Sequence, residues 1–402
     1  MNDLADGFAR HLVDWATTLG APADSLALLD TVARRLATAT SAGHVCVPLA
    51  AFAGSIAVPI EVDFPQPPDE APPDWDEGVF ANGDVRDDHD AVARMREQLL
   101  ASGVVIDAAQ ALSGRSAHPL VVDAGDRLYL RRHFDQERAL AAALVARARG
   151  AVVADASAAP APRQELLDTL FPSRPGAAPD WQKCAVMLAL QGRLTVISGG
   201  PGTGKTTTVA ALLACLLEAQ PELRIALAAP TGKAAARMLE ALRQRAQTLP
   251  AELAARLPAA AFTVHRLLGV TPEPGRFRHH AANPLAVDVL VVDEASMLDL
   301  ALATRLIDAL QPTARLVLLG DKDQLASVEA GAVFAELSVE CVFSAPMRAR
   351  LGLMPGAEPA STSMLADSVV WLTESHRFRA DSGIGRLATD IRTGQGEAAL
   401  AW

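Results

Sequence analysis

The stretch Val196-Ile-Ser-Gly-Gly-Pro-Gly-Thr-Gly-Lys-Thr-Thr-Thr208 decides the fold of this chain. Apolar residues from 194 to 197 predict a buried strand, which breaks into a glycine-rich turn. A helical pattern then runs from 205 to 217. Residues 199–206 fit the spacing G-x-x-x-x-G-K-[ST]. The order strand, glycine-rich turn and helix therefore predicts a phosphate-binding loop at the head of an α/β domain.

The residue types in this loop suit the phosphates of a nucleotide. Glycines let successive backbone N–H groups curl around phosphate oxygens, and the positive end of the helix adds to that field. Lys205 is expected to reach the β- and γ-phosphates, and the Thr206 hydroxyl to ligate Mg²⁺. The alternative is a glycine-rich turn without a ligand. The predicted nucleotide-binding residues are Gly199, Gly200, Pro201, Gly202, Thr203, Gly204, Lys205, Thr206 and Thr207.

Length and composition limit the class of protein. With 402 residues, 50% of them hydrophobic, the chain is expected to form two or more domains. It contains no run of 18 apolar residues, so no membrane span is expected. The acidic N-terminus is unlike a targeting peptide, and the four cysteines are far apart in sequence. These features predict a cytoplasmic protein with reduced cysteines.

The net charge of −11 is concentrated in one window. Between Glu61 and Asp90 there are eleven acidic residues and one basic residue, Arg86. This window is also rich in proline, so it is interpreted as an exposed loop or linker, with a specific acidic partner site as the alternative. The overall charge therefore neither supports nor excludes binding to nucleic acid.

The first part of the chain has mainly helical spacing. Apolar residues recur at helical intervals from 8 to 36, and further helices are expected over 92–113 and 135–149. Two apolar runs around a Gly-Asp turn predict a β-hairpin over 120–130. A low-complexity stretch from 151 to 163 marks the predicted domain boundary. This region is interpreted as a docking or scaffold domain, since it carries no recognisable catalytic pattern.

After residue 181, apolar strands alternate with helical patterns. Strands are predicted at 194–198, 225–229, 288–292, 315–319 and 369–372, with a loop from 345 to 363. This alternation is typical of a parallel sheet with crossover helices. Ligands gather at the carboxyl ends of such strands, and polar motifs follow several of these strands.

Two of these motifs are candidates for catalysis. Asp293 and Glu294 end an apolar run, where Asp293 is expected to hold Mg²⁺ and Glu294 to polarise an attacking water. The alternative is an ordinary acidic helix start. Gln324 follows another strand, in Gly320-Asp-Lys-Asp-Gln324, and is expected to contact the γ-phosphate or the attacking water.

Two further motifs point toward nucleic acid. The first motif ends a strand and opens a helix at residues 230–233. There the hydroxyl of Thr231 and the lysine at 233 can bind a phosphate of the nucleic-acid backbone. The second is Phe262-Thr-Val-His-Arg-Leu-Leu-Gly269, in which His265 has a purely structural role as its alternative. The predicted nucleic-acid residues are Pro230, Thr231, Gly232, Lys233, Thr263 and His265.

Together these motifs resemble the superfamily 1 DNA helicases, and within them the RecD family of bacterial exodeoxyribonuclease V (RecBCD) subunits. Glu374-Ser-His-Arg-Phe-Arg-Ala-Asp-Ser-Gly-Ile-Gly385 is similar to a further motif of that family. The resemblance implies a RecA-like ATPase domain that uses ATP and Mg²⁺. It implies that Gln182 contacts the adenine and that Arg377 acts as an arginine finger.

The resemblance also implies partners and a domain plan. It implies 5′→3′ unwinding of duplex DNA ends in double-strand-break repair, in a heterotrimer with RecB-like and RecC-like subunits and without a membrane. The expected parts are a helical docking domain (1–110), a hairpin and helix connection (111–165), the ATPase lobe (166–345) and the start of a second lobe (346–402).

Three functions remain open at this point. The family's second lobe is barely begun at residue 402, so this chain is expected to bind ATP without separating DNA strands by itself. A stand-alone RecD-like helicase is the second reading, and an ATP-binding docking module without translocation is the third. Co-purification with a RecC-like partner and DNA-stimulated hydrolysis of ATP would distinguish them.

Overall fold

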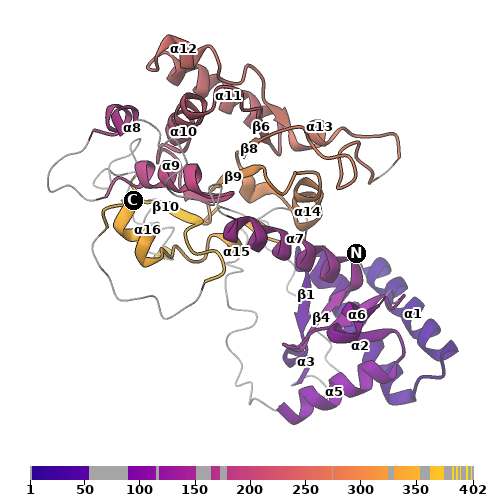
Figure 1. Ribbon diagram of the computed structural model, residues 1–402. Coiled ribbons are helices and arrows are strands. Elements are labelled where there is room, and N and C mark those ends of the chain that lie inside the picture. The colour runs from indigo at the N-terminus through magenta and orange to yellow at the C-terminus, as the bar shows by residue number, and fades with distance from the viewer. Residues whose placement is uncertain are drawn as a thin grey trace. The chain divides into compact units, whose positions relative to one another are not determined.

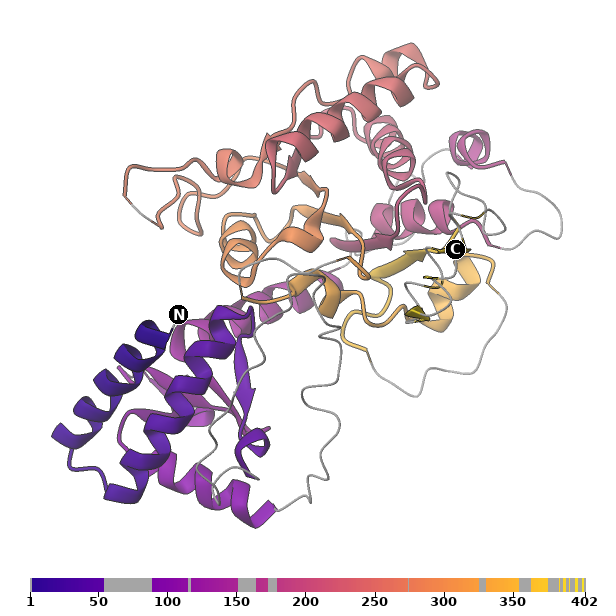
Figure 2. The ribbon, with the colours of Figure 1, turned by 180° about the vertical axis from the view of Figure 1, so that it is seen from behind.

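The computed structural model describes residues 2–53, 89–114, 117–150, 164–172, 179–273, 275–324, 330–353 and 363–374, with isolated positions between 383 and 400 (Figures 1 and 2). The acidic window up to residue 88 and the predicted boundary at 151–163 lie outside these residues. The chain divides into two compact units between Glu137 and Arg138, within helix α7 (Arg131–Arg149).

The first unit packs helices against a small sheet. Its core is apolar, with Leu12, Leu29 and Leu36 fully or almost fully buried. Its strands follow the order β1-β4-β3-β2, in which only β2 and β3 are parallel. The elements before α7 are α1 (Asn2–Thr18), α2 (Ala23–Ser41), β1 (Cys46–Pro48), α3 (Ala50–Ala53), α5 (His89–Ala101), β2 (Val105–Asp107), α6 (Ala108–Ser113), β3 (Leu120–Val122) and β4 (Arg127–Leu130).

The hairpin β3–β4 is confirmed, but it pairs on both sides with strands that the sequence did not predict. The expected helix over 92–113 is confirmed for 92–101 and 108–113 but not between them, because α5 ends before Gly103, whose φ of +72° disfavours other residues. The apolar run that follows it forms β2 and pairs with β3. The hairpin therefore belongs to the sheet of the first unit rather than to a separate connection.

The second unit is built on a six-stranded, fully parallel sheet. Its strand order is β10-β5-β9-β8-β6-β7, which confirms the predicted α/β class with a parallel sheet and crossover helices. The strands are β5 (Leu194–Gly199), β6 (Ile225–Ala229), β7 (Phe262–Thr263), β8 (Val289–Val292), β9 (Arg315–Gly320) and β10 (Val369–Leu372). The carboxyl ends of β5, β9, β8 and β6 thus share one edge.

Helices follow most of these strands along the chain (Figure 1). They are α8 (Gln164–Leu170), α9 (Trp181–Gln191), α10 (Lys205–Ala219), α11 (Gly232–Ala246), α12 (Ala251–Ala254), α13 (Val264–Leu268), the 3₁₀ turn η1 (Ala295–Met297), α14 (Leu300–Asp308), α15 (Val333–Leu337) and α16 (Ala345–Arg350). No described helix combines the length and the apolar character that crossing a bilayer requires.

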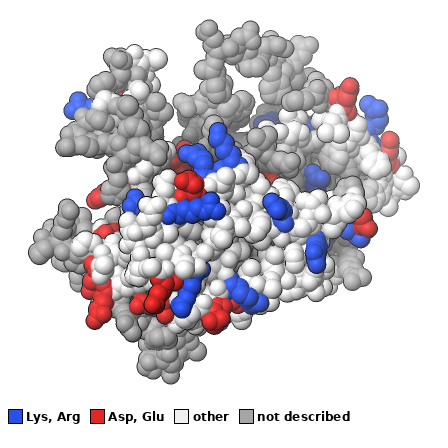
Figure 3. All heavy atoms as spheres, turned by 90° about the horizontal axis from the view of Figure 1, so that it is seen from above, with Lys and Arg blue, Asp and Glu red and all other residues white. Residues whose placement is uncertain are grey.

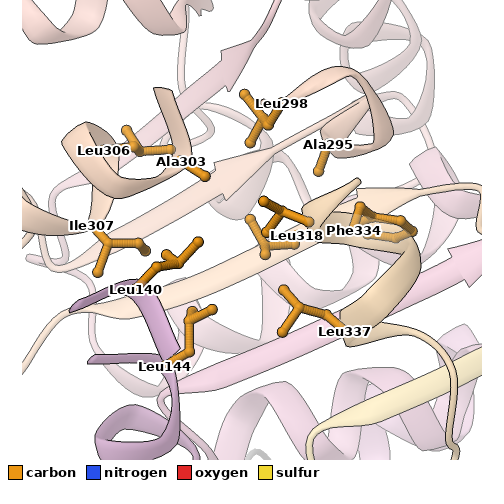
Figure 4. A pocket seen from close by; sticks show the side chains of 11 residues that line it. Leu140, Leu144, Ala295, Leu298, Ala303, Leu306, Ile307, Leu318, Phe334 and Leu337 are labelled. Carbon is orange, nitrogen blue, oxygen red and sulfur yellow. The ribbon is translucent and has the colours of Figure 1, made fainter. Parts of the chain in front are cut away.

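Alternate residues of the strands pack against different helices. Val317 and Leu319 of β9 join the core formed with α9, α10 and α11. Leu318, between them, lies with Leu140 and Leu144 of α7 around a small apolar cavity of about 20 Å³, and Figure 4 shows these side chains pointing toward one another. The sheet is therefore covered on both faces, as the continuous apolar strands require.

Two predictions for the last part of the chain need correction. The sequence predicts a loop over 345–363, but α16 forms at its start, because the Ser344 hydroxyl accepts a hydrogen bond from the Met347 N–H and Asp367 accepts from the Ser344 N–H and hydroxyl. β10 pairs with β5, so residues 369–372 belong to this sheet rather than to a second lobe.

Gly320, at the end of β9, is expected to tolerate no larger residue. A Cβ there would lie 2.8 Å from Cε1 of Phe334, whose ring is buried. We expect Gly320→Ala to lower the free energy of unfolding by about 1–3 kcal/mol, because the ring or the strand has to move. Urea unfolding measures this. Gly7→Ala, in an exposed turn of α1 with no atom within 4 Å, should cause no loss, and equal destabilisation by both changes would contradict the packing argument.

Candidate active site

The predicted phosphate-binding loop joins β5 to α10 in the expected order. Gly202 and Gly204 have φ values of +82° and +87°, which turn the chain tightly before α10 begins. The Thr203 hydroxyl donates to the carbonyl oxygen of Gly200 over 2.9 Å. The Lys205 ammonium donates to the carbonyl oxygens of Gly199 and Gly200, the second over 3.3 Å. These bonds place the lysine across the mouth of the loop.

Two glycines of this loop are required by close neighbours. A Cβ on Gly199 would lie 2.6 Å from Oγ1 of Thr203 and 2.9 Å from Cβ of Leu372. A Cβ on Gly204 would lie 2.3 Å from Nε2 of Gln182. The loop thus packs tightly against α9 and β10 as well as following β5.

Gln182 is positioned by the start of α9. The Asp180 carboxylate caps this helix by accepting hydrogen bonds from the backbone N–H groups of Gln182 and Lys183. The Gln182 side chain then donates from Nε2 to the carbonyl oxygen of Thr203 over 3.0 Å. Cys184, two residues further along α9, is buried, and burial raises the pKa of its thiol to about 11, which fits a packing role.

Asp293 and Glu294 follow β8 at the same edge of the sheet. The Asp293 N–H donates to the carbonyl oxygen of Ala228, and its carboxylate accepts from the Glu294 N–H over 3.0 Å. Glu294 adopts a left-handed conformation with a φ of +53°, which is uncommon for a residue other than glycine. Burial raises the pKa of Asp293, while the Glu294 N–H and the charges of Lys205 and Arg237 oppose that rise.

Gln324 is fixed by a partner that the sequence did not identify. The buried Ser296 hydroxyl, after β8, donates to Oε1 of Gln324 over 2.9 Å. On the other side, the Lys322 N–H donates to the hydroxyl oxygen of Ser198 in β5 over 3.0 Å. These bonds tie the segment after β9 to both neighbouring strands.

One cleft of about 890 Å³ brings these groups together. The predicted residues Gln182, Asp293, Glu294 and Gln324 line it with residues 200–207 of the loop, whereas Arg377 lies outside the described residues. Asp321, which the sequence places at the same edge as Gln324, also lines the cleft, whereas the contribution of α11 was not predicted. The lining residues from α11 are Ala234, Arg237, Met238, Ala241, Gln244 and Arg245. Their helical spacing was a usable signal, but only the fold shows which way this face points.

The two predicted nucleic-acid motifs lie side by side. β6 and β7 pair so that Ala229 is opposite Thr263, and a Cβ on Gly232 would lie 3.9 Å from Cγ2 of Thr263. Thr231 caps α11 and Thr263 caps α13, each with its hydroxyl accepting a backbone N–H. Lys233 is exposed in the first turn of α11.

His265 has a structural contact that fits its alternative reading. Its ring lies 5.9 Å from that of Phe277. Figure 3 shows Lys and Arg side chains mixed with Asp and Glu on the described part of one face, so charge alone identifies no nucleic-acid surface there.

The raised pKa of Asp293 has a consequence for stability. Folding raises this pKa above 3.8, its value in the unfolded chain. The free energy of unfolding therefore falls as pH rises from the unfolded-state pKa to the folded-state pKa, because the carboxyl then ionises in a place that disfavours its charge. Asparagine does not ionise. Asp293→Asn should therefore stabilise the nucleotide-free protein at pH 7, with a gain that vanishes below pH ~4. Urea unfolding with a chelator present, carried out at pH 7 and below pH ~4, measures the gain and its disappearance.

Asp288→Asn is the matched control. The hydrogen bond from Arg224 lowers the pKa of Asp288, so its ionised form stabilises the fold and its replacement should destabilise the protein at pH 7. Shifts of the same sign for the two variants would contradict the assignment of Asp293 as a carboxylate destabilised by burial.

Comparison with known proteins agrees with this geometry. Residues 182–330 match a family model described as AAA domain. "RecBCD enzyme subunit RecD" of Mycolicibacterium smegmatis is 46% identical over 69% of this chain and 45% of its own length. The protein of the same name from Haemophilus influenzae is 44% identical over 59% of this chain and 39% of its own. "ATP-dependent RecD2 DNA helicase" of Deinococcus radiodurans is 36% identical over 54% of this chain and 29% of its own. The chain thus spans less than half the length of the relatives that it matches.

Proposed function

We propose, on the premise that the chain belongs to the RecD family, that it supplies the first ATP-hydrolysing lobe of a 5′→3′ DNA helicase subunit. The single observation that carries this proposal is the shared cleft of the phosphate-binding loop, Asp293, Glu294 and Gln324. The family names of its relatives supply the DNA substrate and the assembly.

The residues of the cleft suit a nucleoside triphosphate with Mg²⁺. The positive-φ turn at Gly202 and Gly204 leaves backbone N–H groups for phosphate oxygens. Thr206 and the half-buried Asp293 would hold the Mg²⁺, which would neutralise developing charge on the phosphates. An oxygen-ligating hydroxyl and a carboxylate are donors that this ion prefers.

Hydrolysis needs a base and a sensor beside these phosphates. Glu294 polarises the attacking water by accepting its proton. Gln324, fixed by the Ser296 hydroxyl, contacts the terminal phosphate or that water and transmits its loss to the segment after β9. Gln182 contacts the adenine of the nucleotide, and Arg377 completes the site from the segment that follows β10.

DNA and partner contacts complete the proposal. A single strand lies across the paired motifs at the ends of β6 and β7, which contribute Pro230, Thr231, Gly232, Lys233, Thr263 and His265. Residues 166–345 form the ATPase lobe together with strand β10, and residues 1–110 contribute to docking. RecB-like and RecC-like chains are the proposed partners at DNA ends.

A forked duplex with a 5′ overhang tests this function. The chain alone should bind Mg-ATP but unwind little, whereas its assembly with RecB-like and RecC-like chains should unwind the fork with ATP. The Lys233→Ala assembly should unwind more slowly, with ATP affinity unchanged. No binding of ATP by the chain, or an assembly whose ATP hydrolysis ignores DNA, would overturn the proposal.

The stand-alone helicase is the second candidate, favoured by the 36% identity with a RecD2 helicase. Failure to co-purify with a RecC-like chain, together with unwinding by the chain alone, would select it. A docking module that binds ATP would instead show co-purification and nucleotide binding but no DNA-stimulated hydrolysis in the assembly.

A further inference from the structure

Helix α11 carries into the nucleotide cleft an arginine that is not among the predicted site residues. Ala235 and Leu242 face the core of the second unit, whereas Arg237 and Ala241, one turn apart, line the cleft. The Arg237 side chain is exposed, and among the described residues no hydrogen bond or ion pair engages it. Its guanidinium is thus available to a ligand in the cleft.

The residues that share the cleft with Arg237 indicate which part of a ligand it can reach. Arg237, Lys205 and Asp293 line the same cleft. Lys205 lies across the mouth of the phosphate-binding loop, and Asp293 follows the neighbouring part of the sheet at β8. Arg237 therefore shares one cleft with the residues expected to hold the phosphates of a bound nucleotide.

The chemistry of an arginine suits that position. A guanidinium presents donors in a planar fork that matches two oxygens of one phosphate group, whereas an ammonium acts as a point charge. Helix α11 is anchored by its Thr231 cap and by buried Met238 and Leu242, so Arg237 is carried on the same rigid lobe as the loop. A contact from it requires no second lobe.

We propose that Arg237 contacts the terminal phosphate of bound Mg-ATP and thereby favours the triphosphate over the diphosphate. This inference rests on the proposed nucleotide function of the cleft. It adds a phosphate contact from α11, and it makes this helix sensitive to hydrolysis, since the contact ends when the terminal phosphate leaves.

Titration calorimetry of the 402-residue chain with Mg-ATP and Mg-ADP tests the proposal. Arg237→Ala should weaken Mg-ATP binding about 10-fold, the loss of a charge-assisted hydrogen bond, and Mg-ADP binding less than ~3-fold. Arg237→Lys should fall between. Arg243→Ala is the matched control, because Arg243 lies on the same helix, donates to the Ala259 carbonyl oxygen and does not line the cleft.

The outcomes separate this inference from the function on which it rests. Equal losses for ATP and ADP, or no loss for either, would overturn the role of Arg237, provided that Lys205→Ala still weakened Mg-ATP binding. Absence of ATP binding by the unaltered chain would overturn both. Thermal unfolding of each variant checks that it is folded. We expect no change for Arg237→Ala, because its side chain is exposed.

Discussion

Glu294→Gln is expected to lower ATP hydrolysis by the assembled enzyme roughly 10²–10⁴-fold, the range for loss of a general base. The amide is nearly isosteric with the carboxylate but cannot accept the proton of the attacking water. Glu294 lines the cleft directly after Asp293, together with the residues of the phosphate-binding loop. ATP affinity should therefore change little while turnover falls. Phosphate release measured beside ATP titration separates the two.

Glu336→Gln provides the control for this experiment. Glu336 is an exposed carboxylate on α15 that does not line the cleft, so its replacement should leave hydrolysis unchanged. Hydrolysis at the unaltered rate in Glu294→Gln would assign Glu294 to the start of η1 alone and place the base elsewhere. A loss of ATP affinity equal to the loss of turnover would instead indicate damage to the cleft.

Lys205→Ala should weaken Mg-ATP binding by roughly 10- to 100-fold, which corresponds to ~1.5–3 kcal/mol for hydrogen bonds to a charged group. The Lys205 ammonium donates hydrogen bonds to the carbonyl oxygens of Gly199 and Gly200, so it is positioned over the loop. Binding of phosphate exchanges these neutral acceptors for charged ones, which are stronger. Titration calorimetry measures the affinity.

Lys233→Ala separates a local effect from a general loss of positive charge. Lys233 is exposed near the start of α11 and does not line the cleft, so ATP affinity should be retained in that variant. Unchanged affinity in Lys205→Ala would refute the assignment of residues 199–206 as a phosphate-binding loop. An equal loss of Mg-ATP affinity in both variants would indicate that the total positive charge of the lobe matters, rather than a direct contact from Lys205.

The sequence determined the second unit well because its signals are local. Continuous apolar runs bounded by glycine and polar residues predict buried parallel strands, and β5, β6, β8, β9 and β10 formed where they were expected. The loop from Gly199 to Thr206 could be recognised because its spacing reflects backbone geometry within eight residues. The placement of Asp293 and Gln324 at one edge also followed, since parallel strands deliver their carboxyl ends together.

The sequence did not determine features that depend on distant partners. Strand β2 is three residues long and gains its stability from pairing with β3, so local helical spacing misidentified it. The role of Ser296 depends on Gln324, which is brought beside it by two neighbouring strands. Arg237 lines the cleft only because Met238 and Leu242 fix the rotation of α11 against the core. Such contacts join residues far apart in the chain, and only the packing of the tertiary structure selects among the faces that a periodic sequence offers.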